Sequence, residues 1–236
     1  MNASPLRDRM HRLAPGIAAG TSLGISDVLA KFRLTGGVDV VSMLSFRSLV
    51  GFAFVASWFR FGRRPTANVQ VRVVSTVVGI IFAALIFCLF KAIETIDVPT
   101  AILSYFTYPL PTGLTAAVVT RAYLVGADAR LTTWYSMLAS TAIFLVASFA
   151  QQAWNLPHSG LAWTYLVALS FAATAAILFI FLSTVRIGAF RTAVIMHLEP
   201  LTATILSALM GQVITPVQAL GMIIMLAGLI AFQVWR

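Results

Sequence analysis

The chain has 236 residues, of which 60% are hydrophobic and only 10% are charged, whereas a soluble domain has roughly 25% charged residues. This composition excludes a soluble domain and indicates a protein whose surface faces lipid. The net charge of +9 could suggest a nucleic-acid partner. However, the arginines gather in short loops between apolar runs, so no nucleic acid is expected.

Eight apolar runs are long enough to span, or nearly span, a hydrocarbon core about 30 Å thick. Backbone polar groups in lipid must bond within their own segment, so each run is expected to be a helix. The predicted fold class is therefore all-α, a polytopic transmembrane helix bundle. In chain order, the predicted spans are residues 14–32, 40–59, 73–91, 100–119, 131–149, 161–185, 192–210 and 217–235.

Positive charge divides unevenly between the loops. If the N-terminus is cytoplasmic, 12 of the 16 Lys and Arg residues fall on the inner side. Three residues, Lys31, Arg33 and Lys91, fall on the outer side, and Arg47 lies within the second span. Inner loops of membrane proteins carry the excess of positive charge, so both termini are predicted to be cytoplasmic.

Two parts of the chain repeat each other at a fixed offset of 91 residues. The register holds without a gap from the pair Ala84 and Ala175 through the pair Pro109 and Pro200. The predicted topology makes the third and sixth spans run in opposite directions, so the repeat is expected to be inverted. Inverted repeats with interrupted helices are typical of secondary transporters.

Three charged residues fall inside predicted spans, where each costs at least about 2.5–3.5 kcal/mol without a partner or a wet cavity. Asp27 and Arg47 lie in the outer parts of adjacent spans. They predict either an ion pair that holds the first hairpin together or a contact with substrate or proton. Glu199 lies in the seventh span without an evident partner. It would serve proton coupling, balance a cationic substrate, or bond as a neutral group to nearby backbone.

Pro109 and Pro200 are each predicted to kink a span, because proline has no amide hydrogen to donate. Pro109 cannot bond the carbonyl of Tyr105, and Pro200 cannot bond that of Met196. A freed carbonyl in a membrane must face protein or a cavity. His197 lies on a different helix face from Glu199, and we expect it to pack rather than to relay protons.

A polar stripe follows one face of the fourth span, at positions i, i+3, i+7 and i+10. Its residues are Tyr105, Tyr108, Thr112 and Thr115. We predict that this stripe lines a substrate path together with Arg47 and Glu199. The alternative is that the tyrosines hydrogen bond between helices.

Glycines recur every four residues in the first span, at Gly16, Gly20 and Gly24. Small residues at this spacing make one face flat enough for close helix contact in lipid. This face is therefore predicted to be a packing surface.

The sequence carries no catalytic or cofactor motif. It has no HExxH pattern, no Gly-rich phosphate loop and three scattered histidines. Its single cysteine, Cys88, cannot form an intramolecular disulfide. We therefore expect no enzyme activity, no cofactor and no metal.

Two segments resemble a known family. Residues 85–121 contain FCLFKAIETIDVPTAILSYFTYPLPTGLTAAVV, and residues 182–233 read LSTVRIGAFRTAVIMHLEPLTATILSALMGQVITPVQALGMIIMLAGLIAFQ. The most specific parts are the Glu199–Pro200 pair, the TPVQALG connector and the closing LAGLI. These segments resemble an EamA-type member of the drug/metabolite transporter superfamily.

The resemblance implies an inner-membrane carrier of ten spans, built from two inverted five-span repeats. Such carriers move small metabolites, including amino acids and drugs, often against a proton gradient. By this comparison the chain lacks two spans. We divide it into a first repeat of five spans, residues 1–150, and a partial second repeat of three spans, residues 151–236.

Two functions follow as hypotheses. The first is a secondary transporter that exports or takes up a small metabolite and couples to protons, with a homodimer closing the cavity if one chain cannot. The alternative is a transport-inactive remnant or an accessory membrane subunit. Besides the bilayer, the expected partners are a small-molecule substrate, protons and a second copy of the chain.

Overall fold

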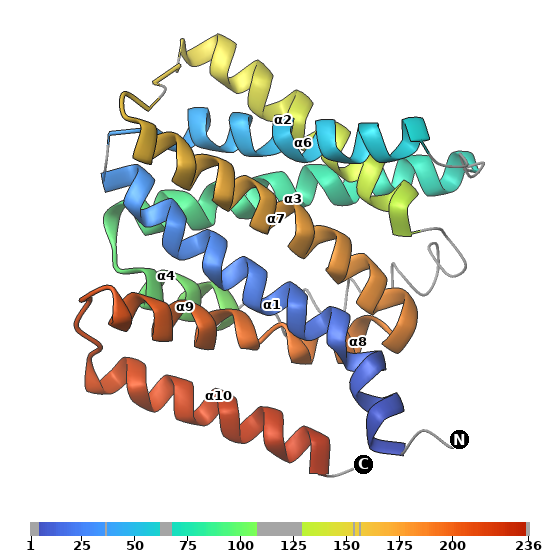
Figure 1. Ribbon diagram of the computed structural model, residues 1–236, viewed down its shortest axis with the longest axis vertical. Coiled ribbons are helices and arrows are strands. Elements are labelled where there is room, and N and C mark those ends of the chain that lie inside the picture. Colours follow the sequence, from blue (N-terminus) through green and yellow to red (C-terminus); the bar gives the residue numbers. More distant parts are fainter. Residues whose placement is uncertain are drawn as a thin grey trace.

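The computed structural model describes residues 5–35, 37–61, 68–107, 129–152, 154–155 and 157–234. Every regular element in these ranges is an α-helix, which confirms the predicted all-α class (Figure 1). In chain order the helices are α1 (Pro5–Thr35), α2 (Val40–Phe61), α3 (Val69–Thr95), α4 (Val98–Thr107), α6 (Ala129–Gln151), α7 (Gly160–Ile187), α8 (Ala189–Ile195), α9 (Leu198–Leu209) and α10 (Pro216–Val234).

Six stretches of the described helices are long and apolar enough to cross a membrane. They correspond to the first, second, third, fifth, sixth and seventh predicted spans. The fourth predicted span is described only as far as Thr107, and its remainder lies outside the described residues. The eighth corresponds to α10, whose shorter apolar stretch is Pro216–Gly228. The protein is therefore a multi-pass helical membrane protein.

Successive helices run back and forth between two ends of the bundle (Figure 1). Both chain termini lie towards the same end, on the right of Figure 1, together with the α7–α8 connection. The opposite end, which we call the loop end, carries residues 37–39, 96–97, 157–159 and 210–215. The predicted topology requires this alternation and assigns the loop end to the outside.

The helix boundaries follow the 91-residue offset of the sequence. Shifting the bounds of α3 by 91 residues gives 160–186, and α7 spans Gly160–Ile187. The same shift moves the start of α4 to residue 189, where α8 begins. Furthermore, α3 and α7 run in opposite directions (Figure 1), as an inverted repeat requires. We call α3–α4 the first copy and α7–α9 the second copy.

The first copy is held to α6 by small polar residues. Ser136 Oγ donates to the carbonyl of Ser75 at 2.9 Å, and Ser140 Oγ donates to the carbonyl of Gly79 at 3.0 Å. A Cβ added to Gly79 would lie 2.5 Å from the carbonyl oxygen of Ser136. The two backbones therefore touch, as is common where small residues and hydroxyls join helices in lipid.

The second copy packs against α1, which contacts both α7 and α9. A Cβ added to Gly16 would lie 3.0 Å from Ser183 Oγ, and one added to Gly24 would lie 2.8 Å from the carbonyl oxygen of Glu199. Gly20 lies equally close to Leu198. This confirms the predicted glycine packing face and shows that the face belongs to the second copy.

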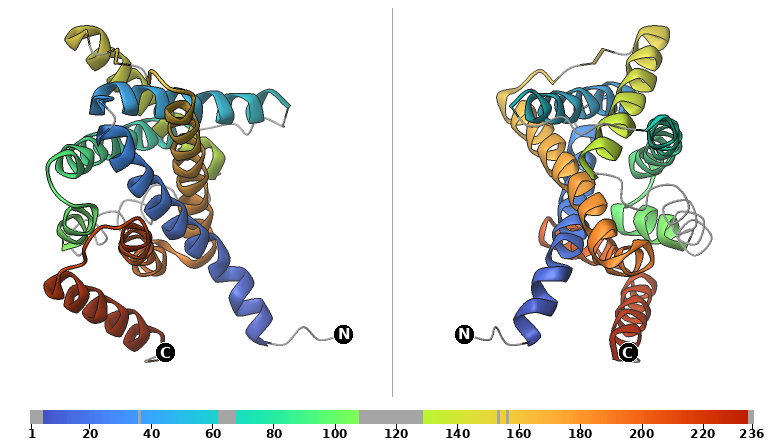
Figure 2. Two further views of the ribbon diagram at one scale, coloured as in Figure 1. Left: turned by 60° about the vertical axis from the view of Figure 1, so that its left-hand side comes forward. Right: turned by 90° about the vertical axis from the view of Figure 1, so that its right-hand side faces the viewer.

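At the edge of the bundle, α10 stands apart from the other helices (Figure 2). It contacts α4, where Gln218 Nε2 donates to Thr100 Oγ1 at 2.7 Å. The amide of Thr215 donates to Gln218 Oε1 at 2.8 Å and so closes the first turn of α10. The contact with α4 therefore links the last helix to the first copy.

Candidate functional site

Three charged side chains meet inside the bundle, each from a different helix. Asp27 of α1, Arg47 of α2 and Glu199 of α9 are only 1%, 6% and 3% exposed. Arg47 attracts both carboxyl groups electrostatically, and the carboxyl groups of Asp27 and Glu199 lie close enough to interact with each other. The expectation that Glu199 lacks a partner is therefore wrong, because α1 brings Asp27 to it.

This arrangement suits a bound proton. A carboxylate can only accept hydrogen bonds, so Asp27 and Glu199 can hydrogen bond to each other when one of them carries a proton. With one proton bound, the remaining negative charge balances the guanidinium of Arg47. Charge balance matters here because unpaired charges are costly away from water. The cluster can thus hold one proton, or one equivalent positive charge, without excess charge.

Among the described residues, two buried polar atoms of the cluster have no hydrogen-bond partner, namely Asp27 Oδ2 and Arg47 Nη1. More than about nine in ten buried polar groups in proteins are bonded, so unpartnered ones require an explanation. The carboxylate oxygen can accept a hydrogen bond and the guanidinium nitrogen can donate one. Together they can bind a solute that carries both a donor and an acceptor.

The guanidinium of Arg47 lies over the ring of Phe90 in α3, with 5.2 Å from Cζ to the ring centroid. Phe90 is completely buried. A desolvated cation–π contact of this kind contributes about 2 kcal/mol or more. Phe90 therefore holds Arg47 in place without occupying its donors. The 91-residue offset pairs Phe90 with Phe181, and no local motif assigns Phe90 this role.

Of the predicted polar stripe, the structure describes the first residue, Tyr105 of α4. Tyr105 is partly buried and interacts electrostatically with Asp27, Arg47 and Glu199. It therefore joins the cluster from a fourth helix. The remaining stripe residues and one predicted kink lie outside the described residues, and they are Tyr108, Pro109, Thr112 and Thr115.

Glu199 lies just after an interruption between α8 and α9. The last residue of α8 is Ile195, and Pro200 is the third residue of α9. The interruption falls at Met196, whose carbonyl a proline four residues later cannot bond. That carbonyl accepts instead from the amide of Glu199 at 2.9 Å, so it is not left free.

The side chain of His197 stabilises the interruption. Its Nδ1 donates to the carbonyls of Ala193 and Val194, at 3.0 and 3.1 Å. These are carbonyls near the end of α8, where a helix leaves acceptors without partners. His197 thus caps α8, which is a more specific role than the packing role expected from the sequence.

The interruption places Glu199 in the first turn of α9. A helix N-terminus carries a partial positive charge that favours a carboxylate or a bound anion. Broken helices whose ends face a central site are a common way to build a solute site in transporters. The cluster, its two unpartnered atoms and the broken helix therefore form one candidate solute site.

Comparison with protein families identifies the family of the chain. The model of the EamA-like transporter family matches residues 112–232. This match covers 121 of the 236 residues, which is more than half of the chain. Comparison with curated proteins and with solved structures gave no match. Members of the matched family are membrane transporters of small solutes rather than enzymes. The helical membrane fold agrees with the family match, and the chain belongs to the EamA-like transporter family.

Proposed function

We propose that the chain is a secondary transporter that exports or takes up a small metabolite, such as an amino acid or a drug-like compound, across the inner membrane. The observation that carries this proposal is the pair of buried, unpartnered atoms Asp27 Oδ2 and Arg47 Nη1. They sit beside Glu199 and Tyr105, among side chains contributed by four helices. A solute with an acceptor for Arg47 and a donor for Asp27 would complete the hydrogen bonding of both.

The carboxyl pair gives this transporter a means of proton coupling. A proton bound by this pair would be shared between Asp27 and Glu199, and a solute that bonds to Asp27 would compete with that arrangement. Binding of solute and binding of the proton are then linked through one site. Reciprocal linkage of this kind is what couples two ligands thermodynamically.

The rest of the path extends from Tyr105 through Tyr108 and Thr112 along the fourth predicted span. The excess of arginines in the loops at one end supports cytoplasmic termini, and both termini lie towards the same end of the bundle. We propose the division into repeats 1–150 and 151–236 on the offset shared by α3 and α7. In a homodimer, the partner molecule would close the path where the partial repeat leaves it open.

Reconstitution into proteoliposomes tests the proposal. The purified chain is screened with radiolabelled amino acids and cationic dyes while a trapped pH-sensitive dye reports proton movement. We expect solute flux with proton movement in the native chain. In Glu199→Gln, proton movement should fall at least about tenfold, a change that corresponds to about 1.4 kcal/mol.

The matched control is Glu94→Gln, which removes a carboxyl group at the exposed end of α3. It should leave both fluxes unchanged. Absence of flux for every solute in the folded native chain would favour the inactive remnant or the accessory subunit. Proton movement that survives Glu199→Gln and Asp27→Asn together would exclude the carboxyl pair as the coupling site.

A further inference from the structure

One lysine joins α1 to the end of α3. Lys31 Nζ donates to the carbonyl of Ile93 at 2.6 Å and to the carbonyl of Ile96 at 2.9 Å. Both carbonyls lie at the C-terminal end of α3, where helix carbonyls lack partners within the helix. The partial negative charge of a helix C-terminus also favours a cation there. These contacts are therefore well matched in charge and geometry.

Lys31 lies between the candidate solute site and the loop end. It follows Asp27 by four residues in α1, so both side chains lie on the same face, one helical turn apart. Asp27 belongs to the buried cluster, whereas the carbonyl of Ile96 accepts where α3 ends. A solute that moves from the cluster towards the loop end along this face of α1 must pass Lys31.

The bonds of Lys31 connect α3 of the first copy to α1, which lies in the proposed first repeat but packs against the second copy. The glycine face fixes α1 against α7 and α9, so α1 moves with the second copy. The carbonyls that Lys31 bonds belong to α3, which is in the first copy. Alternating access is largely the rocking of one repeat against the other. Bonds that join the two copies at one end must break when that end opens.

Two aromatic contacts strengthen the same end, although they do not join the two copies. The rings of Phe32 and Tyr165 lie 6.2 Å apart and link α1 to α7, while those of Phe46 and Trp163 lie 5.4 Å apart and link α2 to α7. Both contacts fix a helix onto the second copy. Lys31 therefore provides a direct polar link to α3 from the group of helices formed by α1, α2 and the second copy.

We propose that Lys31 is a latch that holds the loop end of the solute path closed, and that its two bonds to α3 break when the path opens to that side. This inference rests on the proposed transport function, because a latch requires a path to close. Removal of the latch shifts the population of the transporter towards the state that is open at the loop end.

Thiol accessibility measures this shift without knowledge of the substrate. In a Cys88→Ser background, Tyr105→Cys places one reporter thiol beside the cluster. Proteoliposomes of sorted orientation are treated with a membrane-impermeant maleimide from either side. Lys31→Gln should speed labelling from the loop end about tenfold, a change equivalent to about 1.4 kcal/mol, and should slow labelling from the other end. Lys31→Arg, which keeps a cationic donor, should restore slow labelling.

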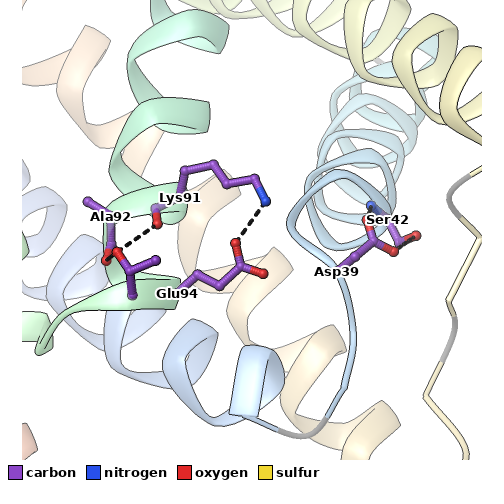
Figure 3. A network of polar contacts seen from close by, with 6 residues as sticks. Asp39, Ser42, Lys91, Ala92 and Glu94 are labelled. Carbon is purple, nitrogen blue, oxygen red and sulfur yellow. Dashed lines mark hydrogen bonds and ion pairs between the residues drawn. The ribbon is translucent and has the colours of Figure 1, made fainter.

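The matched control is Lys91→Gln. Lys91 lies at the same end of α3 and pairs with Glu94 at 2.8 Å on the surface of its own helix (Figure 3). The pair with Glu94 does not join the two copies. The labelling rate of the reporter thiol in Lys91→Gln should therefore match the rate in the chain that keeps Lys31. Equal labelling rates in Lys31→Gln and Lys91→Gln, with both variants folded by size-exclusion chromatography, would overturn the latch. A reporter that labels from neither end in any variant would instead contradict the proposed path.

Discussion

Among the described residues, the two copies of the repeat differ in where a helix is interrupted, although their helices begin in the same register. In the first copy, α4 runs from Val98 to Thr107. In the second copy, the equivalent α8 stops at Ile195, and α9 begins at Leu198. Both copies have a proline at the equivalent position, yet Tyr105 is helical where its counterpart Met196 ends a helix. The proline alone therefore does not decide where the helix breaks.

The surroundings of the second copy explain the difference. Gly20 of α1 lies against the break, because an added Cβ would be 3.3 Å from the amide of Glu199 and 3.5 Å from the carbonyl of Ile195. His197 caps α8 from within the break. A helix interruption thus forms where a packed neighbour and a side-chain cap stabilise it. The same sequence pattern, a proline at the equivalent position, therefore accompanies a continuous helix at Tyr105 and a helix break at Met196.

The largest expected effect comes from the paired phenylalanines of the two copies. Phe90 is fully buried beneath Arg47, whereas its counterpart Phe181 is partly exposed. Phe90→Ala should lower the free energy of unfolding by about 3–5 kcal/mol, and Phe181→Ala should cost clearly less. Unfolding in mixed detergent micelles, followed by circular dichroism, measures both. Equal losses would show that the copies are packed alike at this position.

Next in size is the effect of crowding the contact between α1 and the second copy. A Cβ on Gly24 would lie 2.8 Å from both the carbonyl oxygen of Glu199 and Cβ of Thr202. Gly24→Ala should therefore destabilise the fold by about 1–3 kcal/mol. Gly228→Ala is the control, because a Cβ there meets open space. The same unfolding assay would contradict the tight packing if both variants behaved alike.

A smaller loss of stability is expected when His197 of the second copy is replaced by the residue type found at the equivalent position of the first copy. His197→Phe introduces the side-chain type of Phe106 and removes the donor to the carbonyls of α8. The carbonyl of Val194 still accepts from the backbone amide of residue 197 at 3.2 Å. Only the carbonyl of Ala193 is left unpaired, so the cost should be near the lower end of about 1–3 kcal/mol. His158→Phe, at an exposed loop position, is the control. If His197→Phe left stability unchanged, the ring would not be what caps the break.

The smallest effect is expected for Pro200→Ala. Pro200 lies in the first turn of α9, where a missing amide hydrogen is tolerated. The change should therefore alter the free energy of unfolding by less than about 1 kcal/mol. The break should persist, because α1 and His197 still hold it. An interior proline costs a helix roughly 3 kcal/mol. If Pro200→Ala raised the free energy of unfolding by nearly that much in the same assay, the proline would be the cause of the break.

Much of the architecture follows from local features of the sequence. The apolar runs predicted helices, and the helices of the described residues begin and end close to those runs. The offset that pairs Ala84 with Ala175 also predicted which helix boundaries would correspond. Such features are readable because helix formation in lipid depends on the segment itself.

The candidate site was less accessible to sequence reasoning. Asp27, Arg47 and Glu199 were singled out because buried charges are rare and costly in a membrane. Their grouping was only half anticipated, since Glu199 was assigned no partner. Phe90 and the cap formed by His197 were not anticipated, because a phenylalanine or a histidine in an apolar helix usually only packs. The local sequence pattern therefore identifies unusual residues but does not show which of them meet in the folded chain.

The sequence by itself determined the all-α membrane class, the repeat and the charged residues that must be accommodated. These follow from hydrophobicity, helix periodicity and the cost of charge in lipid, which are properties of single segments. The tertiary structure alone decided that Asp27 meets Glu199, that Lys31 reaches α3 and that the second copy breaks at Met196, where its counterpart Tyr105 is helical. Each of these depends on how α1 crosses the other helices, and a crossing is set by side-chain packing between segments distant in the chain.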